Sequence, residues 1–267
     1  MLRIGWHCRC IAAVLSSYVL GTSAVLGMIG FVSRHILRRP IVSVFLLYPA
    51  RREYADALAY RWHQRRFSWH PGLVGFYRQG ERHGLIFGIP NLEDDVRAEQ
   101  SAPCLLQLMA RMEAARNRVG ASRKVFAGVL PSTFARNGIE NEHLAEQRHL
   151  TARAVLHALD DILTRHGLGS DVPVLVLGGR GYIASEVLRL CDGRNVSSID
   201  VGDLDKFRQF AADYDGGPAV VVNLTKSGAL SDYASAFWPG VIVLNEVYPE
   251  PSAAEIAALE DRGAVCY

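Results

Sequence analysis

The chain has 267 residues, which is enough for one large domain or two domains of ordinary size. Apolar residues make up 49% of the sequence and charged residues 21%, which indicates a globular protein and excludes a disordered one. A formal net charge of +2 gives no support for a nucleic-acid partner. The five cysteines fit neither a disulfide framework nor a zinc pattern, so a reducing compartment is expected.

Residues 1–38 form an apolar N-terminal segment. Within it, residues 11–32 carry no charge and would span about 30 Å of hydrocarbon as a helix. Arginines follow at once, and positive residues beside a spanning helix favour the cytoplasmic side. The segment therefore predicts a membrane anchor that holds a cytoplasmic protein on the inner face of a membrane. A cleaved signal peptide, a buried helix and a natural start at Met28 are the alternatives.

Residues 39–168 predict a smaller N-terminal α/β domain that contributes to the substrate site. An apolar, β-branched run at 41–48 predicts a buried strand. Segments 73–77 and 85–89 flank a glycine-bearing turn and predict a β-hairpin. The other expected elements are helices at 51–67, 101–119 and 142–166, and a strand at 125–130 that ends in a loop at Pro131-Ser132-Thr133.

Residues 169–267 predict a second domain, with a boundary near Gly167–Asp171. Strands and helices alternate strictly in this part of the sequence, which predicts a parallel sheet covered by helices on both faces. A Rossmann-type domain usually continues past a fifth strand, so we expect the C-terminus to be truncated or completed by a partner. The expected strands are 174–177, 196–199, 219–224, 241–244 and 264–267, and the expected helices are 182–190, 204–212, 230–237 and 253–259.

The first strand of the second domain runs directly into a glycine-rich turn. The turn reads Gly178-Gly179-Arg180-Gly181-Tyr182-Ile183-Ala184. Small residues let the backbone turn sharply and let a phosphate approach the amides, while the next helix directs its positive end at the pyrophosphate. Because the turn lies between a strand and a helix, it predicts a site for NAD or NADP. The alternative is a turn that binds nothing.

Asp200 ends the second strand, about 20 residues after the glycine turn. A carboxylate at this position accepts hydrogen bonds from the adenosine ribose hydroxyls. Asp200 and Asp203 would repel a 2′-phosphate, so the sequence favours NAD over NADP. The alternative role for Asp200 is to cap the next helix.

Polar residues also follow the third and fourth strands. Asn223, Thr225 and Lys226 follow one strand, and Tyr248 follows the other. The carboxyl ends of parallel strands line the binding crevice of such sheets. We therefore expect these side chains to contact the nicotinamide half of the cofactor or the substrate. A polar loop and a simple turn are the alternatives.

The sequence of residues 174–185 resembles the glycine turn of the cyanobacterial long-chain acyl-carrier-protein reductases, and shikimate-dehydrogenase-like domains are similar there too. The Lys226 loop and the Tyr248-Pro249 turn extend the resemblance. It implies a Rossmann fold, a nicotinamide cofactor and a fatty acyl thioester substrate. The reductase family's cysteine nucleophile and the shikimate dehydrogenase motif have no counterpart in this sequence, and the resemblance does not transfer that cysteine's role to Cys266.

The leading hypothesis is an NAD(P)-dependent oxidoreductase of lipid metabolism that acts on a carbonyl or acyl substrate. Thr133, Lys226 and Tyr248 are expected near the substrate, and Lys226 or Tyr248 would donate to the developing oxyanion. No metal is expected. A homodimer is expected. The alternatives are a dinucleotide-binding or regulatory module without catalysis, and a fragment of a larger reductase.

Overall fold

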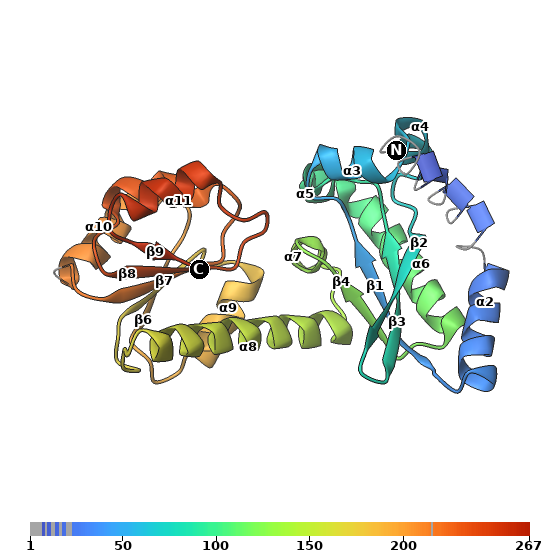
Figure 1. Cartoon of the computed structure of the whole chain (residues 1–267), viewed down its shortest axis with the longest axis horizontal. Helices are drawn as coiled ribbons and strands as arrows, with labels where there is room; N and C mark the ends of the chain where they lie inside the picture. Colours follow the sequence, from blue (N-terminus) through green and yellow to red (C-terminus); the bar gives the residue numbers. More distant parts are fainter. Residues whose placement is uncertain (1–6, 9, 12–13, 16–17, 20–22, 215) are drawn as a thin grey trace. The chain divides into compact units, whose positions relative to one another are not determined.

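A computed structural model describes residues 7–8, 10–11, 14–15, 18–19, 23–214 and 216–267 (Figure 1). The chain divides into two compact units, Met1–Ala145 and Glu146–Tyr267. The division falls inside helix α8 (Glu142–Arg165), earlier than the boundary expected near Gly167–Asp171. Ala152, Val155 and Leu159 of α8 belong to the core of the second unit, which explains the earlier division.

The N-terminal unit contains a four-stranded sheet in the order β2-β3-β1-β4. Strand β1 is parallel to β3 and β4, and β2 is antiparallel to β3, which confirms the expected hairpin. Val44, Leu46, Leu85 and Phe87 from the central strands are buried, as the apolar runs predict. The strands are β1 (Ile41–Leu47), β2 (Gly72–Gln79), β3 (Arg82–Gly88) and β4 (Arg123–Phe126).

Helix α6 (Ala102–Val119) is the long helix of this unit. Leu105, Leu108 and Met112 lie at helical spacing and are fully buried, so one stripe of α6 packs on the core. Gly120 ends the helix in the left-handed conformation, with φ 69°. The remaining helical segments are α2 (Ser23–Phe31), η2 (Val32–Ile36), α3 (Arg52–Leu58), α4 (Arg61–Arg66), α5 (Glu93–Arg97), η3 (Glu99–Ser101) and α7 (Leu130–Arg136).

Two expectations for this unit were wrong. The segment 51–67 forms two helices, because Ala59 is extended and the side chain of Gln64 donates hydrogen bonds to the carbonyls of Ala55 and Ala59 at the break, at 3.0 and 2.9 Å. The strand expected at 125–130 ends at Phe126. Thr133 therefore lies in α7 rather than in a loop, because prolines are readily accepted in the first turn of a helix.

Helix α2 packs against α6. Leu26 and Gly30 of α2 are buried, and a Cβ added at Gly30 would lie 2.7 Å from the Cα of Val119. The guanidinium of Arg34 then donates a hydrogen bond to the carbonyl of Gly120 at 2.9 Å. The close approach at Gly30 fixes one face of α2 against α6, while Met28 and Phe31 on the same helix are exposed.

The expected membrane anchor, residues 11–32, lies partly outside the described residues. Among the helices that the structure does describe, none combines the length and the apolar character that crossing a bilayer requires.

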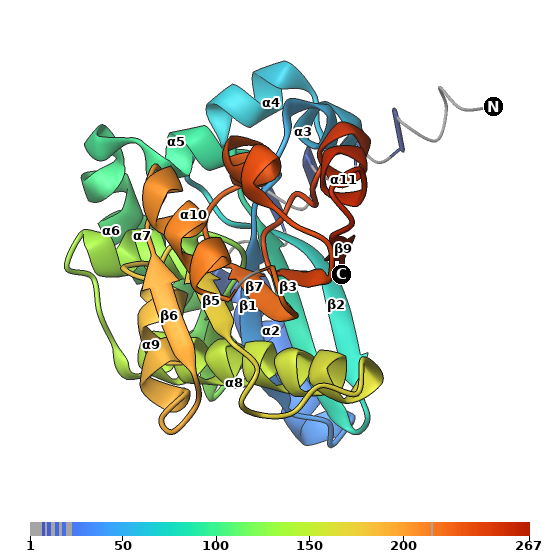
Figure 2. The same cartoon turned by 90° about the vertical axis from the view of Figure 1, so that its left-hand side faces the viewer.

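The C-terminal unit contains a five-stranded parallel sheet in the order β6-β5-β7-β8-β9. Figure 2 shows β6 at one edge of this sheet and β9 at the other. The order reverses direction between β5 and β7, which is the topological switch point of a doubly wound sheet. The strands are β5 (Val174–Leu177), β6 (Val196–Ile199), β7 (Ala219–Asn223), β8 (Val241–Asn245) and β9 (Val265–Cys266).

Helices cover both faces of this sheet (Figure 1). Val174 and Val176 of β5 pack in a core with α8 and α9, while Leu175 and Leu177 pack in a second core with α10, η4 and α11. This alternation of buried side chains confirms the predicted α/β class with a parallel sheet. The helical segments are α9 (Tyr182–Leu190), α10 (Leu204–Asp213), η4 (Ala229–Ala236), a 3-10 helix, and α11 (Ala253–Glu260).

Candidate functional site

The glycine turn lies between β5 and α9, beside the switch point. The amides of Gly178 and Gly179 donate to the carbonyl of Ile199 at 2.7 and 3.2 Å, and the amide of Gly181 donates to the carbonyl of Gly178 at 2.7 Å. Gly178 has φ +87°, and a Cβ there would lie 3.0 Å from the Thr225 methyl group. A Cβ at Gly181 would lie 2.9 Å from the Gly178 carbonyl oxygen. The tight turn therefore requires glycine at both positions.

The start of α9 continues the turn. Gly181 is its N-cap residue, with an extended backbone at φ −65° and ψ 156°. Tyr182 and Ile183 are half-buried, and Ala184 is buried where the helix meets the sheet, as expected of the third small residue. The first turn of a helix leaves amides without intrahelical acceptors, and these amides bind anions. The turn and the helix start thus fit a pyrophosphate group.

Arg180 and Asp200 bridge the glycine turn and the end of β6. The amide of Arg180 donates to Asp200 Oδ1 at 3.1 Å, and its Nε donates to Asp200 Oδ2. The Arg180 amide and guanidinium lower the pKa of the Asp200 carboxyl, so it is ionised at neutral pH. The N-cap residue of α10 is Asp203, so Asp200 is not the cap that the alternative interpretation required.

Tyr233 supports the loop that contains Asp200 and Gly202, a role that the sequence did not predict. Its hydroxyl accepts from the amide of Gly202 at 3.0 Å and donates to the carbonyl of Asp200 at 3.1 Å. Tyr233 is 1% exposed, and burial raises its pKa. A tyrosine inside an expected apolar helix carries no sequence signal for this role.

Asn223, Thr225 and Asn245 form a hydrogen-bonded group at the carboxyl ends of β7 and β8. The Asn223 amide group donates to Asn245 Oδ1 at 2.8 Å, and Thr225 Oγ1 donates to Asn223 Oδ1 at 2.6 Å. Asn223 is 1% exposed. Sequence analysis gave Asn245 no role, although two asparagines at matching ends of neighbouring strands are a usable signal. These three side chains fix the loops of the rim.

The three expected catalytic residues differ in their surroundings. Lys226 is exposed on the loop after β7, and among the described residues no partner bonds to its amino group. Tyr248 is 62% exposed on the loop after β8. Thr133 belongs to the other unit and is 2% exposed within α7. Glu246, also after β8, is exposed as a residue, yet desolvation of its carboxyl raises the pKa. The rim thus offers an ammonium, a phenol and a carboxyl.

Together, the parallel order β6-β5-β7-β8-β9 and the glycine turn at the β5/β7 switch point define a Rossmann-type α/β unit. No protein-family model matches the sequence, and a comparison with curated proteins found no match either.

Solved dehydrogenase structures show a distant similarity. Hetero-hexameric glutamate dehydrogenase from Thermus thermophilus, in its leucine-bound form, is 16% identical with a TM-score of 0.38 over 85% of this chain. The chain spans 64% of that protein. Methylenetetrahydrofolate dehydrogenase-cyclohydrolase from Trypanosoma brucei, complexed with NADP and an inhibitor, is 14% identical with a TM-score of 0.39, over 92% of this chain and 86% of its own. At this level of similarity the Rossmann assignment depends on strand order and the glycine turn.

Proposed function

We propose that the protein is an NAD(P)-dependent oxidoreductase that acts on a carbonyl or acyl substrate. One observation carries the proposal: a glycine turn that admits no Cβ at Gly178 or Gly181 lies beside the switch point of a parallel sheet and opens a helix. Ligands of open α/β sheets bind in the crevice at this point. The dinucleotide supplies a hydride when bound, and the residues of this chain hold and orient it.

The pyrophosphate would lie over Gly178–Ala184, against the first-turn amides of α9. The adenosine ribose would then reach Asp200, whose ionised carboxylate accepts from ribose hydroxyls and favours NAD. Arg180 is bound to the same carboxylate, so its guanidinium lies where a 2′-phosphate would meet it. Asn223 and Thr225 would shape the nicotinamide end of the crevice. Both NAD and NADP are therefore candidates, with NAD favoured.

Lys226 and Tyr248 are the proposed donors to the oxyanion that develops on the substrate carbonyl. An exposed ammonium at the strand rim can turn toward a bound substrate, and a phenol can act in the same way. The hydroxyl of Thr133 is buried inside α7, so it is the weakest of the three candidates.

The resemblance of residues 174–185 to acyl-carrier-protein reductases supports a fatty acyl thioester as the substrate. Burial raises the pKa of both the Cys191 and the Cys266 thiols, which disfavours the reactive thiolate. Reduction would therefore proceed without a covalent intermediate on either cysteine. The same observation favours the second candidate, a dinucleotide-binding module without catalysis. A homodimer stays part of the proposal.

Titration calorimetry with NAD, NADH, NADP and NADPH tests cofactor binding. Gly181→Asp should abolish binding, because its carboxylate would meet the pyrophosphate, and Gly181→Ala should weaken it through crowding alone. Gly193→Asp adds the same carboxylate near the C-terminal end of α9, where nothing lies within 4 Å of a Cβ. Its φ of +81° strains the substituted backbone and costs stability, but the position lies outside the turn, so the variant should bind the cofactor as the wild type does. Circular dichroism would show that each variant is folded. Equal affinity of Gly181→Asp and Gly193→Asp would remove the turn from the site.

Turnover separates the two candidate functions. The enzyme should convert an acyl thioester, NAD(P)H and a proton into an aldehyde, the free thiol and NAD(P)⁺. Loss of absorbance from the reduced cofactor and detection of the aldehyde measure this reaction. Tight cofactor binding without turnover of thioesters, aldehydes or ketones would favour the binding module.

A further inference from the structure

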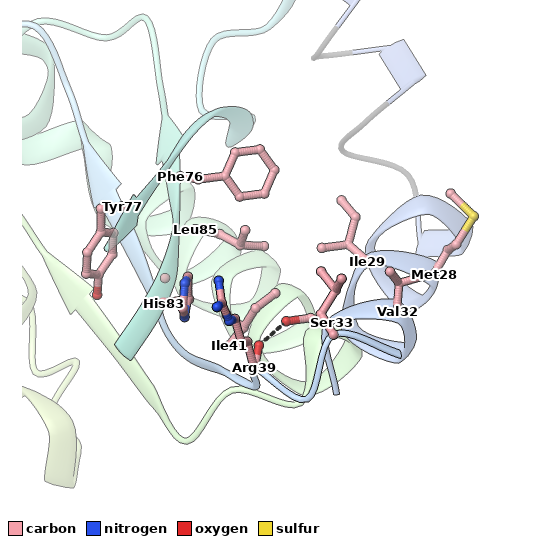
Figure 3. Close-up of a pocket in the computed structure, with 12 residues that line it drawn as sticks. Met28, Ile29, Val32, Ser33, Arg39, Ile41, Phe76, Tyr77, His83 and Leu85 are labelled. Atoms are coloured by element: carbon pink, nitrogen blue, oxygen red, sulfur yellow. Dashed lines mark hydrogen bonds between the residues drawn. The ribbon is translucent and has the colours of Figure 1, made fainter. Parts of the chain in front are cut away.

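A cavity of about 460 Å³ lies in the N-terminal unit, between α2–η2 and the β2–β3 hairpin (Figure 3). This volume falls in the range of about 300–1,000 Å³ that small-molecule sites occupy. Ile29 and Val32 line it from the helical side, and Ile41, Phe76 and Leu85 line it from the sheet. The walls are therefore apolar, and they do not include the glycine turn.

The sheet wall follows from strand register. Phe76 pairs with Leu85 and Ile41 pairs with His83, so these four side chains share one face of the sheet. Tyr77 lies on the opposite face, where its hydroxyl bonds to Ser43. Ile41 and Leu85 also belong to the core of this unit, so the cavity borders only the part of this face that extends toward Phe76 and His83.

Arg39 and His83 bring positive and hydrogen-bonding groups to one end of the cavity, with Phe76 toward the other end (Figure 3). The backbone of Arg39 is fixed by Ser33: its amide donates to the Ser33 carbonyl at 2.8 Å, and the Ser33 hydroxyl donates to the Arg39 carbonyl. Within the part of the chain that the structure describes, no acid pairs with the Arg39 guanidinium. The buried Nδ1 of His83 has no hydrogen-bond partner there either.

The backbone beside this end is unusual. Segment η2, Val32–Ile36, is a π-helix, and Arg38 has a left-handed backbone with φ 52°. Both conformations are rare for residues of these types and concentrate at functional sites. They turn the chain so that Ser33, Leu37 and Arg39 reach the cavity while Arg38 does not.

The rim of the cavity is apolar and open to solvent. Met28 and Leu37 are each 60% exposed, and Phe76 is 68% exposed. No aspartate or glutamate lines the cavity among the described residues. A ligand that suits these surroundings has an apolar body and one anionic head.

We propose that this cavity binds an amphiphilic carboxylate of medium chain length. The carboxylate would accept hydrogen bonds from the guanidinium of Arg39, which presents a planar fork, and from the ring of His83. The alkyl chain would then lie along Ile29, Val32 and Phe76. This site is independent of the dinucleotide site, and either proposal can fail without the other.

Titration calorimetry of the full chain with hexanoate, octanoate and decanoate tests the apolar part. Affinity should rise by about fourfold for each methylene that becomes buried, with one ligand per chain. Affinity that does not change with chain length would overturn the proposal. This measurement needs no variant, so it holds even where a substitution unfolds the protein.

Matched arginine variants test the head group. Arg39→Gln should weaken decanoate binding by about tenfold or more, the scale of losing hydrogen bonds to a charged group. Arg38→Gln removes a neighbouring charge outside the cavity and should leave decanoate binding unchanged. Equal losses in the two variants would show general electrostatic attraction and overturn the proposal.

Vesicles distinguish a free amphiphile from a lipid in a membrane. Vesicles of phosphatidylcholine with phosphatidylglycerol would be mixed with the chain and sedimented. We expect decanoate to bind in the absence of vesicles. We also expect this binding to be lost in Arg39→Gln and kept in Arg38→Gln. Binding to anionic vesicles alone, removed by salt and weakened equally by Arg38→Gln and Arg39→Gln, would instead assign the region to a membrane surface and overturn the cavity site.

Discussion

Arg180 donates hydrogen bonds to both carboxylate oxygens of Asp200, one from its amide and one from its guanidinium. The contact joins the glycine turn to the end of β6. It also brings the group that would bind a ribose and the group that would bind a 2′-phosphate into one ion pair. Cofactor preference in this protein should therefore depend on both residues together.

Asp200→Asn should shift binding toward NADP. If Asp200 binds the adenosine ribose as proposed, the substitution removes a negative charge near the 2′-position and frees the exposed Arg180 guanidinium. A shift of about fivefold in the ratio of dissociation constants is then expected. Calorimetry with NAD and NADP measures it. Asp203→Asn, whose parent carboxylate pairs with Lys206 at 2.9 Å, is the control and should shift the ratio less. A wild type that strongly prefers NADP would contradict the assignment of Asp200.

Two glycines of α2 give opposite predictions. Gly30→Ala should destabilise the N-terminal unit, because its Cβ would lie 2.7 Å from the Val119 backbone and force α2 away from α6. Gly27→Ala meets nothing within 4 Å and should stabilise the same helix by about 0.5–1 kcal/mol. Hydrogen exchange of α2 amides measures both effects. Exchange in Gly30→Ala that is no faster than in the wild type would show that α2 does not depend on this packing.

Glu186 should make the stability of α9 depend on pH. Its buried carboxylate accepts from Arg189 at 2.7 Å and from His149 at 2.9 Å, and these contacts lower its pKa to about 2. Because the folded-state pKa is depressed, the stabilisation is present above the ordinary value of 4.5 and is lost as the pH falls toward 2. Glu186→Gln should therefore speed hydrogen exchange in α9 at pH 7, and the difference from wild type should shrink in acid.

Glu250→Gln is the control for Glu186→Gln, since Glu250 is exposed on a loop. It should leave exchange in α9 unchanged at every pH. If the protection factors of the wild-type α9 amides do not change between pH 7 and pH 3, the Glu186 contacts contribute nothing measurable to the stability of the helix.

Sequence predicts most of this fold because its elements are marked locally. Strands β5, β7 and β8 are apolar runs that begin after proline or glycine, and all the strands from β5 onward lie within one residue of their expected bounds. The break at Ala59 was not predictable in this way, because it depends on the side chain of Gln64 reaching back to two carbonyls. The position of α2 likewise depends on the contact of Gly30 with Val119, residues far apart in the sequence.

Some residues of the candidate site could also be predicted from the sequence, and others could not. The glycine turn is a contiguous motif with a backbone requirement, so its residues are visible in sequence. Tyr233 and Asn245 act through contacts between elements: one supports the Asp200 loop, and the other bonds to Asn223 on the neighbouring strand. Only the fold brings such partners together.

Lys226→Met tests the proposed chemistry. If the ammonium stabilises the oxyanion, the substitution should lower kcat by about 100-fold or more, the usual scale for losing one such donor. Cofactor affinity should change little, because Lys226 would act on the substrate beyond the nicotinamide. Lys206→Met is the control, since Lys206 pairs with Asp203 on the surface and should leave kcat unchanged.

The pattern of kinetic constants decides between three roles for Lys226. A fall in kcat with unchanged cofactor affinity supports the oxyanion role. Weaker NAD(P)H binding with kcat preserved would instead mean that the lysine holds the cofactor, and Tyr248→Phe would then test the remaining donor. No change in either constant would make Lys226 a solvated loop residue. The last outcome is the ordinary result for substituting an exposed lysine. A 100-fold fall in kcat would therefore identify Lys226 as a catalytic residue and not as a solvated one.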